Sequence, residues 1–305
     1  MAYYLAVDAG GSKTEFLLAE EDRELGRSLT GTIKRVNADE STAEENLQDA
    51  LAKLEAATGV SLSRVARACV GTSGNTVPLV TDWLRQSFGR HVAGSLIVVG
   101  DVEIALDAGF FGGRGVLALA GTGSNVAARA ANGEVMTAGG WGPILADQGA
   151  GHWIGIEGLR RGFLARDEGQ PTELLEAARK LWNLPTVDAL IEFANTQLPA
   201  RYGSQFAREV VALADGGDRI AQEILEQGGR DLAYLVRLLI ERTRRIEGDA
   251  FLVPTVAFAG SILAHVQRMR DSIEYSLRLR YPDIGMIEGA VDPVRGALWR
   301  ARQGA

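Results

Sequence analysis

Two short segments rich in glycine and hydroxyl residues are the parts of this chain best suited to chemistry. They read Gly-Gly-Ser-Lys at residues 10–13 and Gly-Thr-Gly-Ser at residues 121–124, and each follows a short apolar run. A tight turn of such residues points several backbone N–H groups into one concavity, which binds anions and above all phosphate. Ser12 and Thr122 add hydroxyl donors, and Lys13 adds a positive charge. The pair predicts two phosphate-binding turns that face each other across a cleft between domains.

Neither turn matches the most common nucleotide-binding motifs. A Walker phosphate loop has four residues between its first glycine and a Gly-Lys-Ser/Thr end, and the dinucleotide-binding fingerprint reads Gly-x-Gly-x-x-Gly. The histidines at positions 91, 152 and 265 are too widely spaced for a metal-binding pattern. The sequence also lacks a Gly-x-Ser-x-Gly elbow. These observations disfavour a P-loop enzyme, a nicotinamide-dependent enzyme and a serine hydrolase.

Three carboxylates follow apolar or glycine-rich segments. Asp8 leads into the first of these turns, where it either supports Mg²⁺ through that ion's bound waters or hydrogen-bonds its own turn backbone. Asp101 closes the apolar run SLIVVGD, where it is either the N-cap of a helix or a general base. Asp147 follows the segment GGWGPILA and has the same two interpretations. The residues themselves leave these alternatives open.

Strands are expected to carry the turns, because the glycine clusters sit at the ends of short apolar runs rich in β-branched residues. The runs that predict strands are residues 3–7, 65–70, 96–99 and 116–120. Two strand–turn–strand units, residues 5–19 and 117–130, are similar in kind. They indicate an internal duplication with halves that begin near residues 1 and 115.

Helical patterns occupy much of the remaining chain. Ser41 with Glu44 is typical of a capping box and predicts a helix from Ser41 to about Ala57, with leucines 47, 51 and 54 at helical spacing. Asp292 followed by Pro293 predicts the start of a closing helix. After about residue 149 long helical patterns predominate, and only one run is strand-like. The helical stretches are 172–182, 206–213 and 218 to about 246, and the strand-like run is 254–259.

Length and composition favour a globular protein of two domains. The chain has 305 residues, of which 46% are hydrophobic and 23% charged, and this excludes a mainly disordered protein. The net charge of −7 argues against nucleic acid or an anionic membrane as a partner. Because neither a signal-peptide pattern nor an apolar run of membrane-spanning length is found, we expect a cytoplasmic protein. The single cysteine, Cys69, is expected to be buried and inert.

Four segments of the chain resemble, in order and spacing, the N-acetylglucosamine kinases of the BadF/BadG/BcrA/BcrD ATPase family. They are DAGGSKTE at 8–15, AGTGSN at 120–125, GGWG at 139–142 and ADQGAGHWIG at 146–155. The resemblance covers nearly the whole chain and implies an α/β, two-lobed actin-like ATPase (ribonuclease H-like) fold with an internally duplicated mixed sheet flanked by helices. It implies an N-terminal lobe of residues 1–114, completed by the C-terminal helix 291–305, and a helix-rich C-terminal lobe of residues 115–290.

The same resemblance implies a phosphotransferase that uses ATP to phosphorylate the 6-hydroxyl of N-acetylglucosamine. Asp101 stands where the family keeps its catalytic base, and Asp8 is expected to hold Mg²⁺ through water. Contacts to ATP are expected at Gly10, Gly11, Ser12, Lys13, Gly121, Thr122, Gly123, Gly217, Gly260 and Ser261. Contacts to the amino sugar are expected at Asn37, Ser73, Gly74, Asp101, Gly140, Trp141 and Asp147. Relatives of this kind are usually dimers, so a homodimer is also expected.

The loop beside the expected sugar site departs from the family pattern. Where the family usually reads Gly-Asp-Glu-Gly-Ser, this chain reads Ala-Asp-Gln-Gly-Ala at residues 146–150, without the second carboxylate and the hydroxyl. Two alternatives to an N-acetylglucosamine kinase therefore stay open: a glucosamine kinase, and a catalytically silent sensor that binds sugar and ATP. The family also contains activators of dehydratases with a cysteine-held iron–sulfur cluster, which a single cysteine per chain disfavours.

Overall fold

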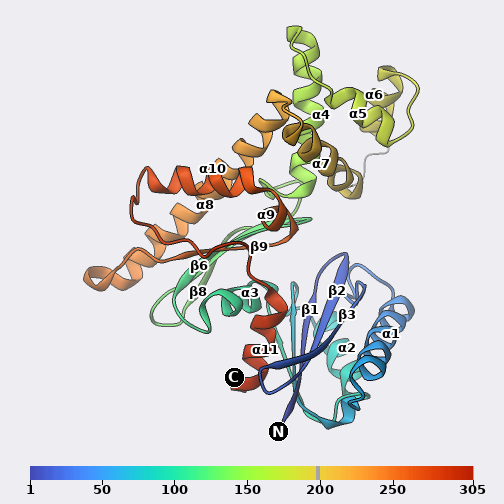
Figure 1. Ribbon diagram of the computed structural model, residues 1–305, viewed down its shortest axis with the longest axis vertical. Helices are drawn as coiled ribbons and strands as arrows, with labels where there is room; N and C mark the ends of the chain where they lie inside the picture. Colours follow the sequence, from blue (N-terminus) through green and yellow to red (C-terminus); the bar gives the residue numbers. More distant parts are fainter. Residues whose placement is uncertain (197–199, 305) are drawn as a thin grey trace. The chain divides into compact units, whose positions relative to one another are not determined.

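The computed structural model describes residues 1–196 and 200–304 and divides into two compact units. Unit 1 comprises Met1–Gly115, Ala131–Val135 and Val291–Ala305, so that it includes the end of the chain. Unit 2 comprises Val116–Ala130 and Met136–Ala290. Each unit contains one sheet with helices packed on it (Figure 1).

The sheet of unit 1 has five strands in the order β3-β2-β1-β4-β5. Strands β1 to β3 form an antiparallel meander, whereas β1, β4 and β5 run parallel to one another. The carboxyl ends of these three parallel strands therefore meet at one edge of the sheet. The strands are β1 (Tyr3–Ala9), β2 (Lys13–Glu20), β3 (Arg23–Gly31), β4 (Val65–Thr72) and β5 (Ser95–Val99).

Helices cover both faces of this sheet. Side chains alternate along β1, so Leu5 and Val7 face a core shared with α1 and α2, and Ala6 faces a core shared with α3 and α11. Cys69 of β4 is fully buried in the second core, as predicted. The helices are α1 (Glu40–Thr58), α2 (Pro78–Gly89), α3 (Asp101–Phe110) and α11 (Pro293–Gln303), with a 3₁₀ turn at Leu62–Arg64.

A buried ion pair holds α11 on α3. Arg300 of α11 donates to the fully buried carboxylate of Asp107 at 2.6 Å and to Glu103 at 3.2 Å. The second oxygen of Glu103 accepts from the Gly100 N–H at 3.0 Å, directly before α3 begins. The C-terminal helix therefore fixes the start of the helix whose first residue is Asp101.

The sheet of unit 2 has four strands in the order β8-β7-β6-β9, the same order as β3-β2-β1-β4 in unit 1. Strands β6 and β9 run parallel, as β1 and β4 do. This correspondence confirms the predicted duplication of a mixed sheet. The strands are β6 (Gly115–Ala120), β7 (Ser124–Arg129), β8 (Val135–Gly139) and β9 (Val256–Ala259).

The long helices of unit 2 pack on one another and on its sheet. Helix α8 contacts β7, α4 contacts α7, and α10 contacts α8 (Figure 1). Their shared core contains Val126, Ile154, Phe206 and Leu232. The helices are α4 (Gly151–Glu168), α5 (Leu174–Leu181), α6 (Val187–Thr196), α7 (Ala200–Asp215), α8 (Arg219–Glu247), α9 (Ser261–His265) and α10 (Gln267–Arg278), with a 3₁₀ turn at Gly248–Ala250.

The predicted capping box at Ser41 is wrong, although the helix itself is present. Asp39 is the N-cap of α1, with an extended backbone, and its Oδ1 accepts from the Thr42 N–H at 2.8 Å. Ser41 lies inside the first helical turn, where its hydroxyl donates to Glu45. The leucines at 47, 51 and 54 are buried as predicted. Among the helices of the described residues, none is both long and apolar enough to span a lipid bilayer.

Candidate functional site

The first turn, Gly10–Lys13, joins β1 to β2. The Gly10 N–H donates to the Lys13 carbonyl oxygen at 3.0 Å and closes the turn. Gly11, Ser12 and Lys13 are exposed, and within residues 1–196 and 200–304 the N–H groups of Gly11 and Ser12 have no hydrogen-bond partner. The Thr32 hydroxyl donates to the Gly10 carbonyl at 2.8 Å and holds the turn in place. The turn thus offers N–H donors and a cation to an anion.

Asp8 stands at the carboxyl end of β1, among other carboxylates. The pKa of Asp8 is raised to about 7, first by burial and then by the negative charges of Asp101, Glu15 and Asp292, while Lys13 lowers it. A positive charge beside Asp8 would reverse this effect, because it stabilises the ionised carboxylate. The site is therefore electrostatically suited to a cation.

The donor set near Asp8 fits a cation that keeps its water. Among the described residues, no group of three or more His, Cys, Asp and Glu side chains is arranged to hold a metal ion. Mg²⁺ is commonly bound through one or two carboxylates while several waters remain in place. A single half-buried carboxylate beside an anion-binding turn is consistent with that mode of binding.

Asp101 is the first residue of α3, directly after β5 and Gly100. Gly100 is the N-cap, so the interpretation of Asp101 as N-cap is wrong. Asp101 Oδ1 accepts from the Val102 N–H at 2.9 Å, and the carboxylate also accepts from the Ser73 hydroxyl. Burial raises the pKa of Asp101, while these two hydrogen bonds and the charge of Lys34 lower it. A partly buried carboxylate with a fixed orientation can accept a proton from a hydroxyl group.

The topology of the sheet brings Asp8, Ser73 and Asp101 to one edge. Asp8 pairs with Gly71 of β4, and Gly71 pairs with Val99 of β5, so the three strands end side by side. The Thr72 hydroxyl ties the end of β4 to β1 by donating to the Ala9 carbonyl oxygen at 3.2 Å. After Ser73 the chain turns at Gly74, whose φ of 82° is in the left-handed region that favours glycine.

Lys34 is a member of this cluster that the sequence analysis missed. Its ammonium group donates to the Ser73 hydroxyl. Asn37, which was expected to contact the sugar, lies in an exposed turn three residues later, and its N–H donates to the Lys34 carbonyl at 2.8 Å. No sequence signal distinguishes Lys34 from other lysines, because its importance comes from the loop that carries it to the end of β4.

The second turn, Gly121–Ser124, joins β6 to β7 in unit 2. The Gly121 N–H donates to the Gly123 carbonyl at 2.8 Å, and the Gly121 carbonyl accepts from the Gly151 N–H at the start of α4, also at 2.8 Å. The Ser124 hydroxyl donates to the Gln148 carbonyl at 2.9 Å. Thr122 is exposed at the tip. The turn is thus braced by the segment that leads into α4.

Asp147 lies directly against the second turn. It is buried, with a pKa raised by that burial and lowered by hydrogen bonds from the N–H groups of Ser124 and Gly142. A Cβ atom on Gly123 would stand 3.1 Å from Asp147 Oδ2, so the glycine allows this close approach. Asp147 therefore connects the second turn to the loop that follows β8.

That loop carries Gly140 and Trp141, both exposed. Gly140 has a φ of 70°, and a Cβ atom there would lie 2.7 Å from the Asn125 side chain. Asn125 is a second residue that the sequence analysis did not single out: its Oδ1 atom is buried and has no hydrogen-bond partner within the described part of the chain. The Trp141 side chain is 73% exposed, so the described residues leave most of its surface uncovered.

The remaining expected ATP contacts also lie in unit 2. Gly260 and Ser261 lie beside the second turn. A Cβ atom on Gly260 would lie 2.4 Å from the Ala120 carbonyl oxygen, and a Cβ atom on Gly121 would lie 3.7 Å from the Ser261 N atom. Gly217 lies in the exposed turn between α7 and α8, with a φ of 96°.

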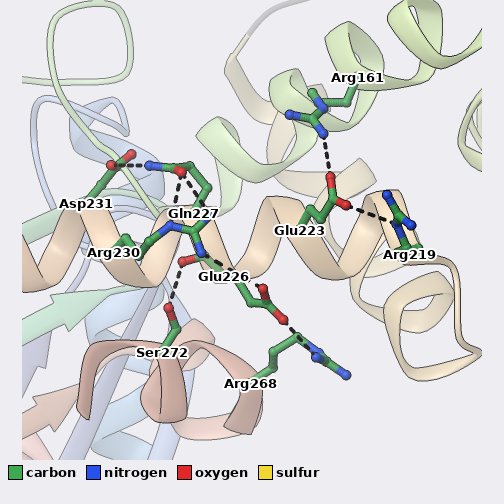
Figure 2. A network of polar contacts seen from close by, with 9 residues as sticks. All are labelled: Arg161, Arg219, Glu223, Glu226, Gln227, Arg230, Asp231, Arg268 and Ser272. Carbon is green, nitrogen blue, oxygen red and sulfur yellow. Dashed lines mark hydrogen bonds and ion pairs between the residues drawn. The ribbon is translucent and has the colours of Figure 1, made fainter. Parts of the chain in front are cut away.

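A separate polar network on α8 involves none of the expected site residues (Figure 2). Glu223 pairs with Arg161 of α4 at 2.7 Å and with Arg219 at 3.2 Å. Glu226 pairs with Arg268 of α10 at 3.0 Å. These ion pairs link α8 to α4 and α10.

Comparison with known proteins gives relatives that span the whole chain. An N-acetylmuramic acid/N-acetylglucosamine kinase from Clostridium acetobutylicum is 28% identical over 99% of both chains. An N-acetyl-D-glucosamine kinase from Dictyostelium discoideum is 24% identical over 96% of both chains. A solved structure of a proposed N-acetylglucosamine kinase from Chromobacterium violaceum shares the fold, with a TM-score of 0.75, 22% identity and 98% coverage of both chains.

The family model for BadF/BadG/BcrA/BcrD ATPases matches residues 5–301, which include both glycine turns, Asp101 and α11 up to Ala301. The two-sheet α/β architecture agrees with the actin-like fold that the sequence resemblance implied. This chain belongs to the BadF/BadG/BcrA/BcrD ATPase family.

Proposed function

We propose that this protein is an ATP-dependent sugar kinase that phosphorylates the 6-hydroxyl of N-acetylglucosamine. The observation that carries the proposal is the Asp101 carboxylate, which is partly buried, oriented by Val102 and Ser73, and located at the same sheet edge as Asp8. The sugar is proposed from the relatives, whose names specify kinases of N-acetylglucosamine and related amino sugars.

In the proposed reaction Asp101 accepts the proton of the sugar hydroxyl. The hydroxyl oxygen forms a bond to the γ-phosphorus, the bond from that phosphorus to the β–γ bridging oxygen breaks, and ADP leaves. The N–H groups of the first and second turns stabilise negative charge on the phosphate oxygens, together with Lys13. Mg²⁺, when bound, would neutralise phosphate charge near Asp8.

The remaining site residues are assigned by the same proposal. Asn37, Ser73, Gly74, Gly140, Trp141 and Asp147 bind the amino sugar; Gly217, Gly260 and Ser261 line the adenosine site. We propose further that units 1 and 2 are the two lobes of the kinase, and that the protein acts in the cytoplasm as a homodimer.

Two other functions are distinguished from this one by the acceptor and by turnover. A glucosamine kinase would favour the free amine over the N-acetyl group. A silent sensor would bind sugar without releasing ADP. Both alternatives arise from the altered loop at residues 146–150. Beside Asp147 this loop lacks a carboxylate and a hydroxyl that the family pattern has.

A coupled ADP-release assay tests the proposal. We expect release that depends on N-acetylglucosamine and exceeds that with glucosamine, N-acetylmannosamine, glucose or anhydro-N-acetylmuramic acid. Asp101→Asn should lower kcat by about 10²- to 10⁴-fold while ATP binding is retained, since general-base catalysis contributes about that factor. Asp49→Asn, on the exposed side of α1, is the matched control and should be unaffected. Near-normal turnover by Asp101→Asn would refute the assignment of the base.

A further inference from the structure

Lys34 occupies a fixed position beside the proposed base. It lies in the segment after β3, where its N–H donates to the Thr32 hydroxyl at 3.1 Å and its carbonyl accepts from Asn37 and Ala38. The neighbouring Ile33 N–H donates to Thr14 of β2 at 3.1 Å. Because this segment is bonded to β2 and to the first turn, the backbone of Lys34 is held in place, and its ammonium group reaches the Ser73 hydroxyl after the end of β4.

The direction of the hydrogen bonds follows from the chemistry of the three groups. An ammonium group can only donate, and an ionised carboxylate can only accept. The Ser73 hydroxyl accepts from Lys34, which leaves its one proton for another acceptor. The strand register places the Asp101 carboxylate beside it, because Ser73 and Asp101 each follow the paired residues Gly71 and Val99 by two positions, and the Ser73 hydroxyl lowers the pKa of Asp101. The result is a directed chain from ammonium to hydroxyl to carboxylate, in which each bond strengthens the next.

The charges around Asp101 make Lys34 the balancing cation. Asp8, at the end of β1, lies at the same sheet edge; because its pKa is raised to about 7, it carries only part of a negative charge near neutral pH when no cation is bound. Glu103, on the same helix as Asp101, is already paired with Arg300 of α11. Among the described residues, no ion pair within 4.0 Å involves the Lys34 ammonium, so its charge is not neutralised by a direct carboxylate partner.

We propose that Lys34 is a positioning residue that acts through Ser73 to hold the Asp101 carboxylate ionised and aimed at the acceptor hydroxyl. This role rests on the proposed kinase function. It assigns Lys34 to the chemical step and not to binding of the neutral sugar, because its contact is with the Ser73 side chain that donates to the base.

The physical consequence is an effect on kcat and on the acidic side of the pH profile. Asp101 works as a base only when ionised, so activity is lost as the pH falls through its pKa. Lys34 lowers the pKa of Asp101, so loss of the ammonium group should raise that pKa and move the acidic limb to higher pH. Charge-assisted hydrogen bonds of this kind correspond to roughly 10- to 100-fold in rate.

A double-mutant cycle between Lys34 and Ser73 tests the proposal. We expect Lys34→Met to lower kcat about 10- to 100-fold with little change in the KM for sugar, and Lys34→Arg to restore part of it. Because part of the effect of Lys34 passes through Ser73, the loss of kcat in Lys34→Met/Ser73→Ala should be smaller than the product of the two single losses. Lys53→Met is the matched control: this lysine is exposed on α1, and in the described part of the chain its one ion pair is with Asp49.

A second readout does not depend on turnover. In the nucleotide-free protein the pKa of Asp101 can be measured by ¹³C NMR of the carboxyl carbons, with Asp101→Asn used to assign the signal. We expect a higher pKa in Lys34→Met than in the wild type or Lys53→Met. If the wild-type protein phosphorylates no sugar, the kinase proposal fails while this comparison still decides the role of Lys34.

Three kinetic results and one titration result would overturn the role of Lys34. The kinetic results are an unchanged kcat in Lys34→Met, a raised KM with normal kcat, and fully additive effects in the double variant. An unchanged pKa of Asp101 would overturn it as well.

Discussion

The packing of the C-terminal helix on α3 gives a prediction with a calculable size. At Gly296 of α11 an added Cβ atom would lie 1.8 Å from the Ile104 carbonyl oxygen and 2.5 Å from the Ala108 N atom. Ordinary contact begins at 3.4 Å, so the methyl group of Gly296→Ala is short by about 1.6 Å. Both obstructing atoms belong to the backbone of α3, so no side-chain rotation can make room.

The free-energy change combines two opposing effects. Overpacking a tight contact usually costs about 1 to 3 kcal/mol, and a clash with two backbone atoms belongs at the upper end. Alanine is favoured over glycine in a helix by about 1 kcal/mol, which offsets part of this cost. We therefore expect Gly296→Ala to lower the free energy of unfolding of unit 1 by about 2 kcal/mol. At roughly 4 °C per kcal/mol for a domain of this size, Tm falls by roughly 8 °C.

Thermal unfolding followed by circular dichroism measures this effect. Gly89→Ala is the matched control, because Gly89 ends α2 and a Cβ atom there meets no heavy atom within 4 Å. That variant should leave Tm unchanged or raise it slightly, since it has the propensity gain without the clash. A Tm for Gly296→Ala equal to or above that of Gly89→Ala would refute the close helix contact.

Two further predictions concern ionisation in unit 1. In Mg²⁺-free buffer the contribution of Asp8 to stability should fall as the pH rises from about 4 to 7, because folded Asp8, with a pKa of about 7, keeps a proton that the unfolded chain releases near 3.8. The denaturation midpoint should therefore fall less over this pH range in Asp8→Asn than in the wild type, and an equal dependence on pH in the two proteins would contradict the reasoning. Burial raises the pKa of the Cys69 thiol to about 12, so the native protein should not react with a thiol reagent at pH 8. Rapid labelling of Cys69 without unfolding would argue against its buried position.

Local patterns in the sequence were sufficient for most strands and both turns. The apolar runs at 3–7, 65–70, 96–99 and 116–120 correspond to β1, β4, β5 and β6, each within two residues at its ends. The runs in β1, β4 and β6 are mostly buried, and such strands have continuous apolar stretches that are easily recognised. The edge strand β5 is only half-buried, but its apolar run is equally continuous. The cap of α1 was placed wrongly because Asp39 and Ser41 both have side chains that can cap a helix, and only the backbone angles decide between them.

The parts of the site that escaped prediction depend on loops and on strand order. Lys34 reaches Ser73 across 39 positions of sequence, through a segment held by Thr32 and Thr14. Asn125 lies against Gly140 of the loop after β8, and its buried Oδ1 atom has no hydrogen-bond partner among the residues that the structure describes. Neither relationship has a periodicity or a motif, so residue types alone do not distinguish these two side chains from others of their kind.

Strand order also explains why the proposed base has the environment it has. If β5 were not the neighbour of β4, Asp101 would still begin a helix, but neither the Ser73 hydroxyl nor the charge of Asp8 would lie near it. The ion pair of Arg300 with Asp107 then fixes the helix that Asp101 begins, from the opposite end of the chain. The pKa and orientation of the carboxylate therefore depend on groups that folding brings together, namely the Val102 N–H of α3, Ser73 after β4 and Lys34 after β3.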